Sequence, residues 1–312
     1  MGKKITGKKE KKKKEKKESR TTHKGSGLLI AVEGIDGSGK GTVINHYGGL
    51  LDCLREHIQD MQIFDVDEWQ SSQLGEGRFS PITNPGTSHR PLYENDNVKG
   101  EVIPRTPGLK ESDVILLSEP SYGGSGYDVR FEVIQDNGRE YSARSTAQSY
   151  SLDREVLDKR IVLPALNNGK VVIKSRCMAS SLVYQPVQAQ RNREPKLNPE
   201  YLIGPDFPGN NHQLLHVMPD LLIIQTISAE EAMERLKGRK EKIDGALFEE
   251  LGFQKAISMI YQEKWLRDIY EARGTRVVYV DVEKSKEEVA EEASSHLETL
   301  LRERRGIIDY DK

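Results

Sequence analysis

The sequence is poor in several features that mark particular classes of protein. It has only two cysteines, Cys53 and Cys177, which lie far apart and form no metal-ligand pattern. This argues against a disulfide scaffold and suits a reducing cytosol, so we expect a cytoplasmic protein. No run approaches the roughly 18 consecutive apolar residues of a membrane span, so we expect no membrane association. The histidines also stand in no metal-ligand spacing.

Positive charge is concentrated at the start of the chain. Residues 1–20 hold ten Lys, one Arg and three Glu, whereas the net charge of all 312 residues is −2. A block of lysines repels itself and has no apolar face to bury, so residues 1–26 are predicted to be a disordered tail. The tail lacks an apolar segment and is therefore not expected to be a secretory signal. Two interpretations stay open, a weak and salt-sensitive contact with nucleic acid or a tail that only adds solubility.

Short apolar runs alternate with longer helical stretches along the rest of the chain. Five runs are rich in Val, Ile and Leu without alternating polar residues, which is typical of strands buried on both faces of a parallel sheet. They are LLIAVE (28–33), VILLS (114–118), KVVIK (170–174), DLLIIQ (220–225) and RVVYV (276–280). Helices are expected at about residues 40–60, 144–167, 179–191, 228–239, 248–272 and 285–304. The alternation predicts a doubly wound α/β fold with a five-stranded parallel sheet and a ligand site at the carboxyl ends of the strands.

One segment interrupts this alternation. Residues 65–111 carry five Pro and five Gly without a sustained period, and loops of this length are usually functional insertions or disordered. We therefore predict one α/β domain over residues 27–305, with an insertion at 61–111 and a short C-terminal tail at 306–312. Within the first predicted helix, the pair Gly48-Gly49 indicates a bend or close packing.

The stretch GIDGSGKGT directly follows the first predicted strand and precedes a predicted helix. The backbone N–H groups of a Gly-rich turn can point inward together, and the following helix adds its positive end. Lys40 would supply a mobile charge to the phosphates of a nucleotide. In this context the pattern GxxxxGK indicates a phosphate-binding loop. The predicted cofactor-binding residues are Gly34, Ile35, Asp36, Gly37, Ser38, Gly39, Lys40, Gly41 and Thr42.

Four stretches together carry a family resemblance. They are VEGIDGSGKGT, SEPSYGGSG, AQSYSLDREVLDKRIVLPALNNGKVVIKSRCMASSLVYQ and PDLLIIQTISAEEAMERLKGRKEKIDGALFEELGFQKAISMIYQEKW. In order and spacing they resemble the nucleoside-monophosphate kinases of the thymidylate kinase family, over about residues 27–300 without 61–111. The resemblance implies a P-loop kinase fold with a helical lid, ATP and Mg²⁺ as cofactors, and phosphorylation of a deoxynucleoside monophosphate, with dTMP as the expected acceptor. It also allows a homodimer, which is common in that family, although nothing else in the sequence requires one.

The same resemblance implies roles for individual residues. Tyr150 matches an aromatic residue that stacks on the thymine ring, and Arg154, four residues later on the same helix face, matches an arginine that reaches the base or phosphate. Arg176 matches an arginine that bridges the acceptor and donor phosphates, and with Lys40 it forms the predicted catalytic pair. The predicted substrate-binding set is Asp36, Glu119, Tyr150, Arg154, Arg176, Ser181 and Tyr184.

A basic stretch matches the lid of the family, which closes over ATP. Arg235, Arg239 and Lys240, followed by Lys242, are predicted to bring positive charge to the transferring phosphoryl group. A solvated helix end is the plain structural interpretation of the same residues.

Four places depart from the pattern of the family, one of which is the Asp-Arg pair of the lid, reduced here to Asp244-Gly245. Ser175 stands where an aspartate helps to organise Mg²⁺, and Ser118 stands where an arginine usually precedes Glu-Pro. Gly41 removes a hydroxyl that usually touches the ion, although GKGT resembles the loop of adenylate kinases. The metal ligands therefore stay unknown. The candidates are Glu33, Glu119 and the acidic residues Asp65, Asp67 and Glu68, for which a solvated turn is the preferred interpretation.

Two alternative functions stay open. Deoxynucleoside kinases share the loop and the Glu-Pro pair, and in such an enzyme Glu119 would act as the base for a sugar hydroxyl. Gly41 and Ser175 instead favour a nucleotide-binding protein with impaired catalysis. Arg154 also has a plain structural interpretation, an i,i+4 ion pair with Asp158 worth a few tenths of a kcal/mol.

Overall fold

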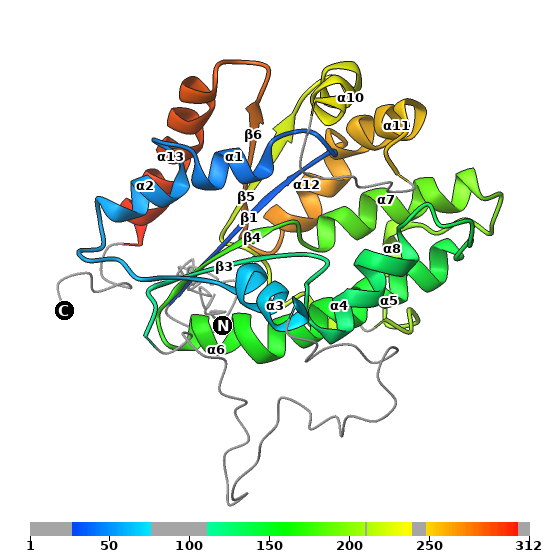
Figure 1. Ribbon diagram of the computed structural model, residues 1–312, viewed down its shortest axis with the longest axis horizontal. Helices are drawn as coiled ribbons and strands as arrows, with labels where there is room; N and C mark the ends of the chain where they lie inside the picture. Colours follow the sequence, from blue (N-terminus) through cyan, green and yellow to red (C-terminus); the bar gives the residue numbers. More distant parts are fainter. Residues whose placement is uncertain (1–26, 76–110, 210, 239–247, 305–312) are drawn as a thin grey trace, which may run out of the picture.

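Six parallel strands form the centre of the fold (Figure 1). The computed structural model describes residues 27–75, 111–209, 211–238 and 248–304 of this chain. The strands are β1 (Leu28–Gly34), β2 (Ile63–Asp65), β3 (Val114–Ser118), β4 (Val171–Ser175), β5 (Leu221–Thr226) and β6 (Arg276–Asp281). Their order in the sheet is β2-β3-β4-β1-β5-β6, and every neighbouring pair is parallel.

Helices cover both faces of this sheet. On one side α13 packs against α1, α2 and β6, while on the other α6 packs on β4 and α7 packs on β1 (Figure 1). The first half of the chain supplies α1 (Lys40–Asn45), α2 (Leu50–Arg55), α3 (Val66–Gly75), α4 (Gly124–Asp128), η1 (Val129–Val133), α5 (Ala143–Leu157), η2 (Asp158–Val162) and α6 (Leu163–Asn167). The second half supplies α7 (Met178–Arg191), α8 (Pro199–Ile203), α9 (Asn211–Leu214), α10 (Ala229–Lys237), α11 (Leu251–Tyr261), α12 (Lys264–Glu271) and α13 (Lys286–Glu303). The predicted doubly wound α/β fold is confirmed.

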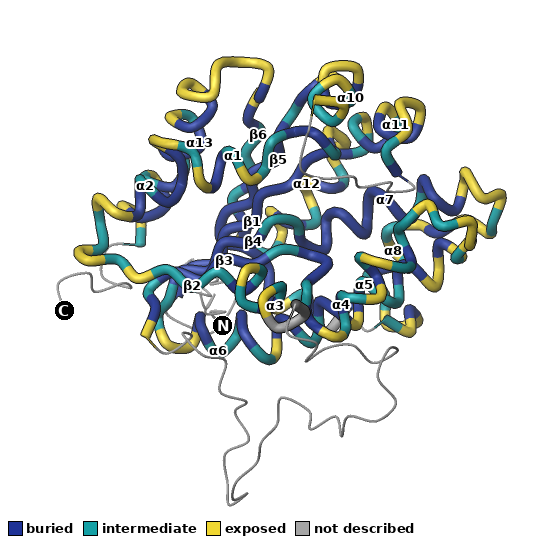
Figure 2. Tube along the Cα trace, viewed as in Figure 1, coloured by how far each residue is buried: buried dark blue, intermediate teal, exposed yellow. Residues whose placement is uncertain are grey.

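The burial of the strands explains their sequence pattern. All seven residues of β1 are buried, as are the first four of β3 and of β4 and the first five of β5 (Figure 2). Strands covered on both faces bury successive side chains, so an uninterrupted apolar run is the expected sequence. The five predicted strands lie within one residue of their predicted positions.

The sheet has one strand more than the five predicted. β2 has only three residues, too few for a hydrophobic pattern, and it pairs with β3 through Ile63 and Val114. It lies at the start of the segment expected to be an insertion, so residues 63–75 form part of the α/β body. The remainder of that segment lies outside the described residues, together with the predicted tails at 1–26 and 306–312.

Two predicted helices are each divided in two. The helix expected at 40–60 is interrupted between α1 and α2, where Gly48 has a φ of 78° and a Cβ on Gly49 would lie 2.5 Å from the carbonyl oxygen of Val43. Both the bend and the close packing expected from the glycine pair are therefore present. The helix expected at 248–272 is interrupted at Glu263, which has an extended backbone and is the N-cap of α12. No Gly or Pro marks this second break, so local sequence gave no signal for it.

Candidate active site

The loop after β1 has a backbone that only glycine adopts readily. Gly37 and Gly39 have φ angles of 82° and 85°, in the left-handed region. A Cβ on Gly37 would lie 2.3 Å from the carbonyl oxygen of Ala232, so α10 also requires glycine there. The Lys40 ammonium donates hydrogen bonds to the carbonyl oxygens of Gly34, at 3.1 Å, and Ile35, at 2.9 Å. The loop is thus a shaped turn of the kind whose inward N–H groups bind phosphate.

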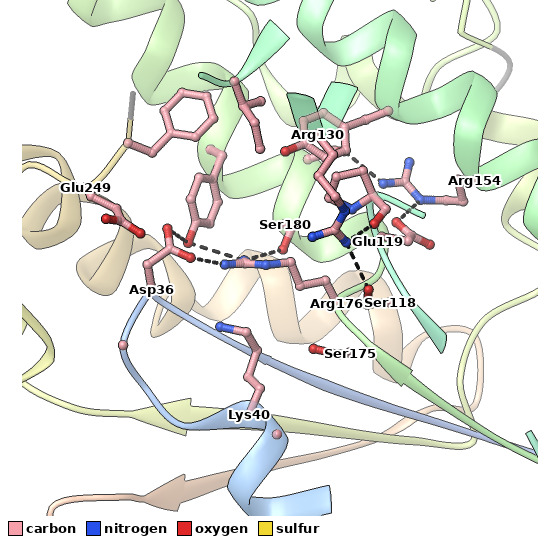
Figure 3. A pocket seen from close by; sticks show the side chains of 18 of the residues that line it. Asp36, Lys40, Ser118, Glu119, Arg130, Arg154, Ser175, Arg176, Ser180 and Glu249 are labelled. Atoms are coloured by element: carbon pink, nitrogen blue, oxygen red, sulfur yellow. Dashed lines mark hydrogen bonds and ion pairs between the residues drawn. The ribbon is translucent and has the colours of Figure 1, made fainter. Parts of the chain in front are cut away.

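A cavity of about 400 Å³ opens above this loop, at the carboxyl ends of β1, β3 and β4 (Figure 3). Because β1 lies where the chain order reverses within the sheet, this is the crevice in which open α/β sheets bind ligands. The predicted residues that line it are Asp36, Gly37, Gly39, Lys40, Gly41, Thr42, Glu119, Tyr150, Arg154, Arg176, Ser181 and Tyr184. Ser118 and Ser175, the two departures from the family pattern, line it as well.

A few predicted residues do not reach the cavity. Gly34 and Ser38 are buried beneath the loop, where Ser38 Oγ donates to Gln225 Oε1 at 2.9 Å, and Ile35 belongs to the apolar core. Arg235 instead contacts Glu231 Oε1 at 3.0 Å and the carbonyl oxygen of Val282 at 2.9 Å. Arg239 and Lys240 lie outside the described residues.

Asp36 and Arg176 are in direct contact at the cavity, with a hydrogen bond from Arg176 Nη2 to Asp36 Oδ1 (Figure 3). The Tyr184 hydroxyl donates to Asp36 Oδ2 at 3.1 Å, and so does Gln254 Nε2 at the same distance. Burial alone would raise the pKa of Asp36, but the charges of Arg176 and Lys40 outweigh it and hold that pKa below its usual value. The carboxylate is therefore ionised and fixed in place.

The backbone of Arg176 is held in the left-handed region, with a φ of 74°. Such a conformation is costly for a residue with a side chain and persists only where its surroundings impose it. Here the Arg176 N–H donates to the Val32 carbonyl at 2.9 Å, and the N–H of Cys177 donates to Glu33 Oε1 at 2.7 Å. The guanidinium is consequently directed into the cavity from a rigid strand end.

A buried cluster of four charged side chains lies under the opposite end of the cavity. Arg154 Nε donates to Glu119 Oε2 at 2.9 Å, while Lys174 Nζ lies 2.7 Å from Glu119 Oε1 and 3.0 Å from Asp158 Oδ1. The exposed fractions of these side chains are only 2–4%. Burial would raise the pKa of Glu119, but Arg154 and Lys174 together lower it. The i,i+4 pair between Arg154 and Asp158, the plain interpretation of this helix, is not formed.

Sequence reasoning missed several residues of the cavity. Arg130 lies on the π-helical segment η1, and its Nη2 donates to Ser118 Oγ at 3.0 Å and to the carbonyl oxygen of Pro120. The absence of an arginine at position 118 was a signal that another cation could fill that space. The other missed residues are Pro120, Ile134, Gln135, Ser180, Gln185, Phe248 and Glu249.

Three buried polar atoms of the cavity lining have no hydrogen-bond partner among the described residues. One is Glu119 Oε1, which has the Lys174 ammonium as its ion-pair partner. The other two are the amide oxygen of Gln185 and Nε of Arg130. Buried polar groups in native proteins are nearly always satisfied, by protein, water or ligand. The lining of the cavity therefore offers a hydrogen-bond acceptor and a cationic donor to a ligand.

The described residues do not form a site that would itself hold a metal ion. No group of three or more His, Cys, Asp or Glu side chains within the described ranges has a suitable arrangement. Glu33 is occupied by Cys177 N, Ser180 N and Oγ and the hydroxyl of Tyr261, and Glu119 by its two cations. Both metal candidates are thus engaged elsewhere.

The acidic segment after β2 is folded rather than a solvated turn. Asp65 Oδ1 accepts from the N–H of Glu68, and Asp67 Oδ1 accepts from the N–H of Ser118 at 3.1 Å. Asp65 and Asp67 are half-buried, and burial raises the pKa of Asp67. Of the three acids, Glu68 alone is exposed as expected.

Comparisons with known proteins point in one direction. A family model described as thymidylate kinase matches residues 106–293, a range that begins after the phosphate-binding loop. The probable thymidylate kinase of Thermococcus onnurineus is 29% identical over 141 residues, which cover 43% of this chain and 62% of that protein. The thymidylate kinase of Caldicellulosiruptor saccharolyticus is 26% identical over 200 residues, or 63% of this chain and 87% of that protein. The match thus spans less than two thirds of the Thermococcus protein but most of the other.

A solved structure of thymidylate kinase from Candida albicans is also similar to this chain. It is 16% identical, with a TM-score of 0.46, and the match covers 90% of this chain and 93% of that one. Within the described residues, no helix is long and apolar enough to cross a membrane.

Proposed function

Because the chain belongs to the thymidylate kinase family, we propose that it transfers the γ-phosphoryl group of ATP to dTMP. The observation that carries this proposal is a single cavity in which a phosphate-binding loop faces a pocket lined by aromatic, amide and arginine side chains. Donor phosphates would lie on the loop beside Lys40, and the acceptor would lie between Tyr150, Gln185 and Arg130.

The geometry supports a reaction driven by positioning and charge. Phosphoryl transfer needs little covalent help from the protein, because alignment and neutralisation of developing charge lower most of the barrier. Lys40 and Arg176 approach the cavity from the ends of β1 and β4 (Figure 3). Arg176, a planar and permanently charged fork, suits the space between two phosphates. An acceptor phosphate is already an anion and requires no general base.

The acceptor wall fits a pyrimidine whose ring carries an N–H group. Tyr150 offers an aromatic face, and burial raises the pKa of its phenol to about 12, so the ring stays neutral. The unsatisfied Gln185 oxygen accepts hydrogen bonds, as the N3–H of thymine would require and the N3 of cytosine would not. An acceptor phosphate would find a donor in Arg130.

We propose that Mg²⁺ enters the site only as the ion bound to ATP. Asp36 and Glu119, two carboxylates of the cavity lining, are already paired with cations. The ion would therefore be held by the phosphates and water, as the loop sequence GKGT suggests. When bound in that way, it would supply further neutralisation of the phosphates. Lys40 and Arg176 act on the phosphates directly.

The geometry disfavours the alternative in which Glu119 deprotonates a nucleoside hydroxyl. Each carboxylate oxygen of Glu119 has a cationic partner, and its pKa is lowered, which makes it a weak base at neutral pH. A monophosphate acceptor needs no base, so the pairing of Glu119 does not argue against it. A homodimer and a nucleic-acid contact of the Lys-rich tail stay predictions.

The test is release of ADP from ATP, measured with dTMP, dUMP, dCMP, AMP and thymidine as acceptors, with and without Mg²⁺. We expect dTMP to be the best acceptor and dCMP to be a poor one. Turnover of thymidine in preference to dTMP would identify a nucleoside kinase. ATP binding without turnover of any acceptor would identify a nucleotide-binding protein, and either result would overturn the proposal.

A further inference from the structure

Lys174 is a buried lysine in the central sheet whose purpose the phosphoryl-transfer chemistry does not explain. It lies on β4, its side chain is 4% exposed, and it does not line the cavity. Lysine is rarely buried to this degree, because removal of an ammonium group from water is costly unless it is fully paired. Its two partners are Glu119 and Asp158, one from the cavity wall and one from η2.

The position of Asp158 makes it a competitor for Arg154. The two residues are four apart in one continuous helical run, the spacing at which a carboxylate and a guanidinium pair on a helix surface. Arg154 is nevertheless directed away from Asp158, and its Nε donates a hydrogen bond to Glu119. Its Nη1 donates to Asn211 Oδ1 at 3.1 Å, and its Nη2 donates to Ser181 Oγ at 2.9 Å. Those contacts place the guanidinium in the cavity wall.

Lys174 removes this competition. Its ammonium lies on Asp158 and on the second oxygen of Glu119, so the cluster contains two positive and two negative groups in alternation. Without the ammonium, two buried carboxylates would share one guanidinium. We propose that Lys174 is a positioning residue for acceptor binding, which holds Asp158 so that Arg154 stays on Glu119 and in the wall of the cavity.

Other titratable groups that face this cluster form no ion pair with its members. Asp153 is engaged by the N–H and hydroxyl of Ser121 and by the hydroxyl of Ser125. Burial raises the pKa values of Cys177 and Tyr270 well above their usual values, so both stay neutral. The competition therefore concerns the two carboxylates and the two cations alone.

The role inferred for Lys174 rests on the proposed function. A set of substitutions tests the role of Lys174. Lys174→Met leaves Asp158 without its counter-ion, and we expect the Kd for dTMP to rise at least tenfold relative to wild type near pH 8. Because burial already raises the pKa of Asp158, this carboxylate takes up a proton readily and then ceases to attract Arg154. The defect should therefore shrink towards about pH 5.5, with each variant compared with wild type at the same pH.

The decisive variant is Lys174→Met/Asp158→Leu, which removes both partners at once. We expect it to bind dTMP within about twofold of wild type at either pH, although it lacks Lys174. The matched control is Lys159→Met, since Lys159 is adjacent to Asp158 but exposed and paired with Glu155, and it should change nothing. Weak binding by the double variant, or wild-type binding by Lys174→Met at all pH values, would overturn the proposal.

A measurement without nucleotide separates this proposal from the proposed function. In a crystal structure of Lys174→Met grown near pH 8, the Arg154 guanidinium should lie on Asp158 and not on Glu119. If wild type fails to phosphorylate dTMP, the proposed function falls, and this structure still decides the position of Arg154. Should Lys174→Met fail to fold, the affinity of the double variant decides the proposal by itself.

Discussion

Removal of the Arg130 guanidinium should weaken acceptor binding much more than it slows the reaction. Arg130 Nη2 is tied to Ser118 Oγ and to the carbonyl of Pro120, and the guanidinium carbon lies 3.9 Å from the centroid of the Tyr122 ring. These contacts fix the side chain in the cavity wall, while its buried Nε keeps no partner among the described residues. The substitution Arg130→Met removes the cation and retains much of the apolar stem.

The expected size follows from the lost contact with the acceptor phosphate. A hydrogen bond to a charged group contributes about 1.5–3 kcal/mol, and each 1.4 kcal/mol is about a factor of ten in affinity. The KM for dTMP should therefore rise by about 10- to 150-fold. Arg130 lies on the Ser118 side of the cavity and Lys40 on the other (Figure 3). Loss of binding that is equal in the ground and transition states leaves kcat nearly unchanged.

Steady-state kinetics with dTMP and with ATP as the varied substrate provide the assay. Arg139→Met is the matched control, because Arg139 is exposed and bonded to Glu132 away from the cavity. The reasoning is refuted if the KM for dTMP in Arg130→Met equals that of wild type, or if the loss appears in the KM for ATP.

Three further predictions concern stability, pH dependence and metal use. Gly49→Ala should lower the free energy of unfolding by about 1–3 kcal/mol, because its Cβ would lie 2.5 Å from the Val43 carbonyl oxygen. Gly124→Ala, whose Cβ meets nothing within 4 Å, is the control in urea unfolding, and equal effects would contradict the argument. Because burial raises the pKa of Tyr150 to about 12, its phenol keeps its proton at pH values at which an ordinary tyrosine begins to lose it. The KM for dTMP should therefore show no Tyr150-dependent change between about pH 8 and 10. A change in wild type that Tyr150→Phe abolishes would disprove this. Ser175→Asp should lower the Mg²⁺ concentration needed for half-maximal rate, because a carboxylate oxygen on the cavity wall is a good Mg²⁺ ligand. The same Mg²⁺ concentration for half-maximal rate in wild type and variant would contradict this prediction.

Features that depend on short stretches of sequence could be predicted. Four of the five longer strands are apolar runs whose pattern arises from burial on both faces. The fifth, β6, is an apolar run at the edge of the sheet in which only Val277 and Val280 are buried, so the expected burial on both faces was wrong there. The turn at 34–42 needs glycines at fixed positions. β2 could not be predicted, because its three residues carry no period and its position depends on pairing with β3. The break before α12 could not be predicted either, since no Gly or Pro marks it.

Contacts between distant parts of the chain escaped prediction for a different reason. From the helix alone, Asp158 is the natural partner of Arg154, but the fold brings Glu119 and Lys174 to the pair from β3 and β4. Arg130 reaches Ser118 only because the π-helical turn of η1 directs it back to the end of β3. Sequence spacing along one helix gives no information on either arrangement.

Gly41 and Ser175 both lack a group that would help to hold Mg²⁺, and the ion pairs of the carboxylates in the site give these two departures a common explanation. Asp36 is held by Arg176, Tyr184 and Gln254, and Glu119 by Arg154 and Lys174. An acid that served a metal ion would first have to break one of these pairs and leave a buried cation unpaired, which costs several kcal/mol. Charge neutralisation around the phosphates therefore falls to the cations Lys40, Arg176 and Arg130, whose side chains face the same cavity. An enzyme arranged in this way should depend more on its arginines than on any single metal ligand.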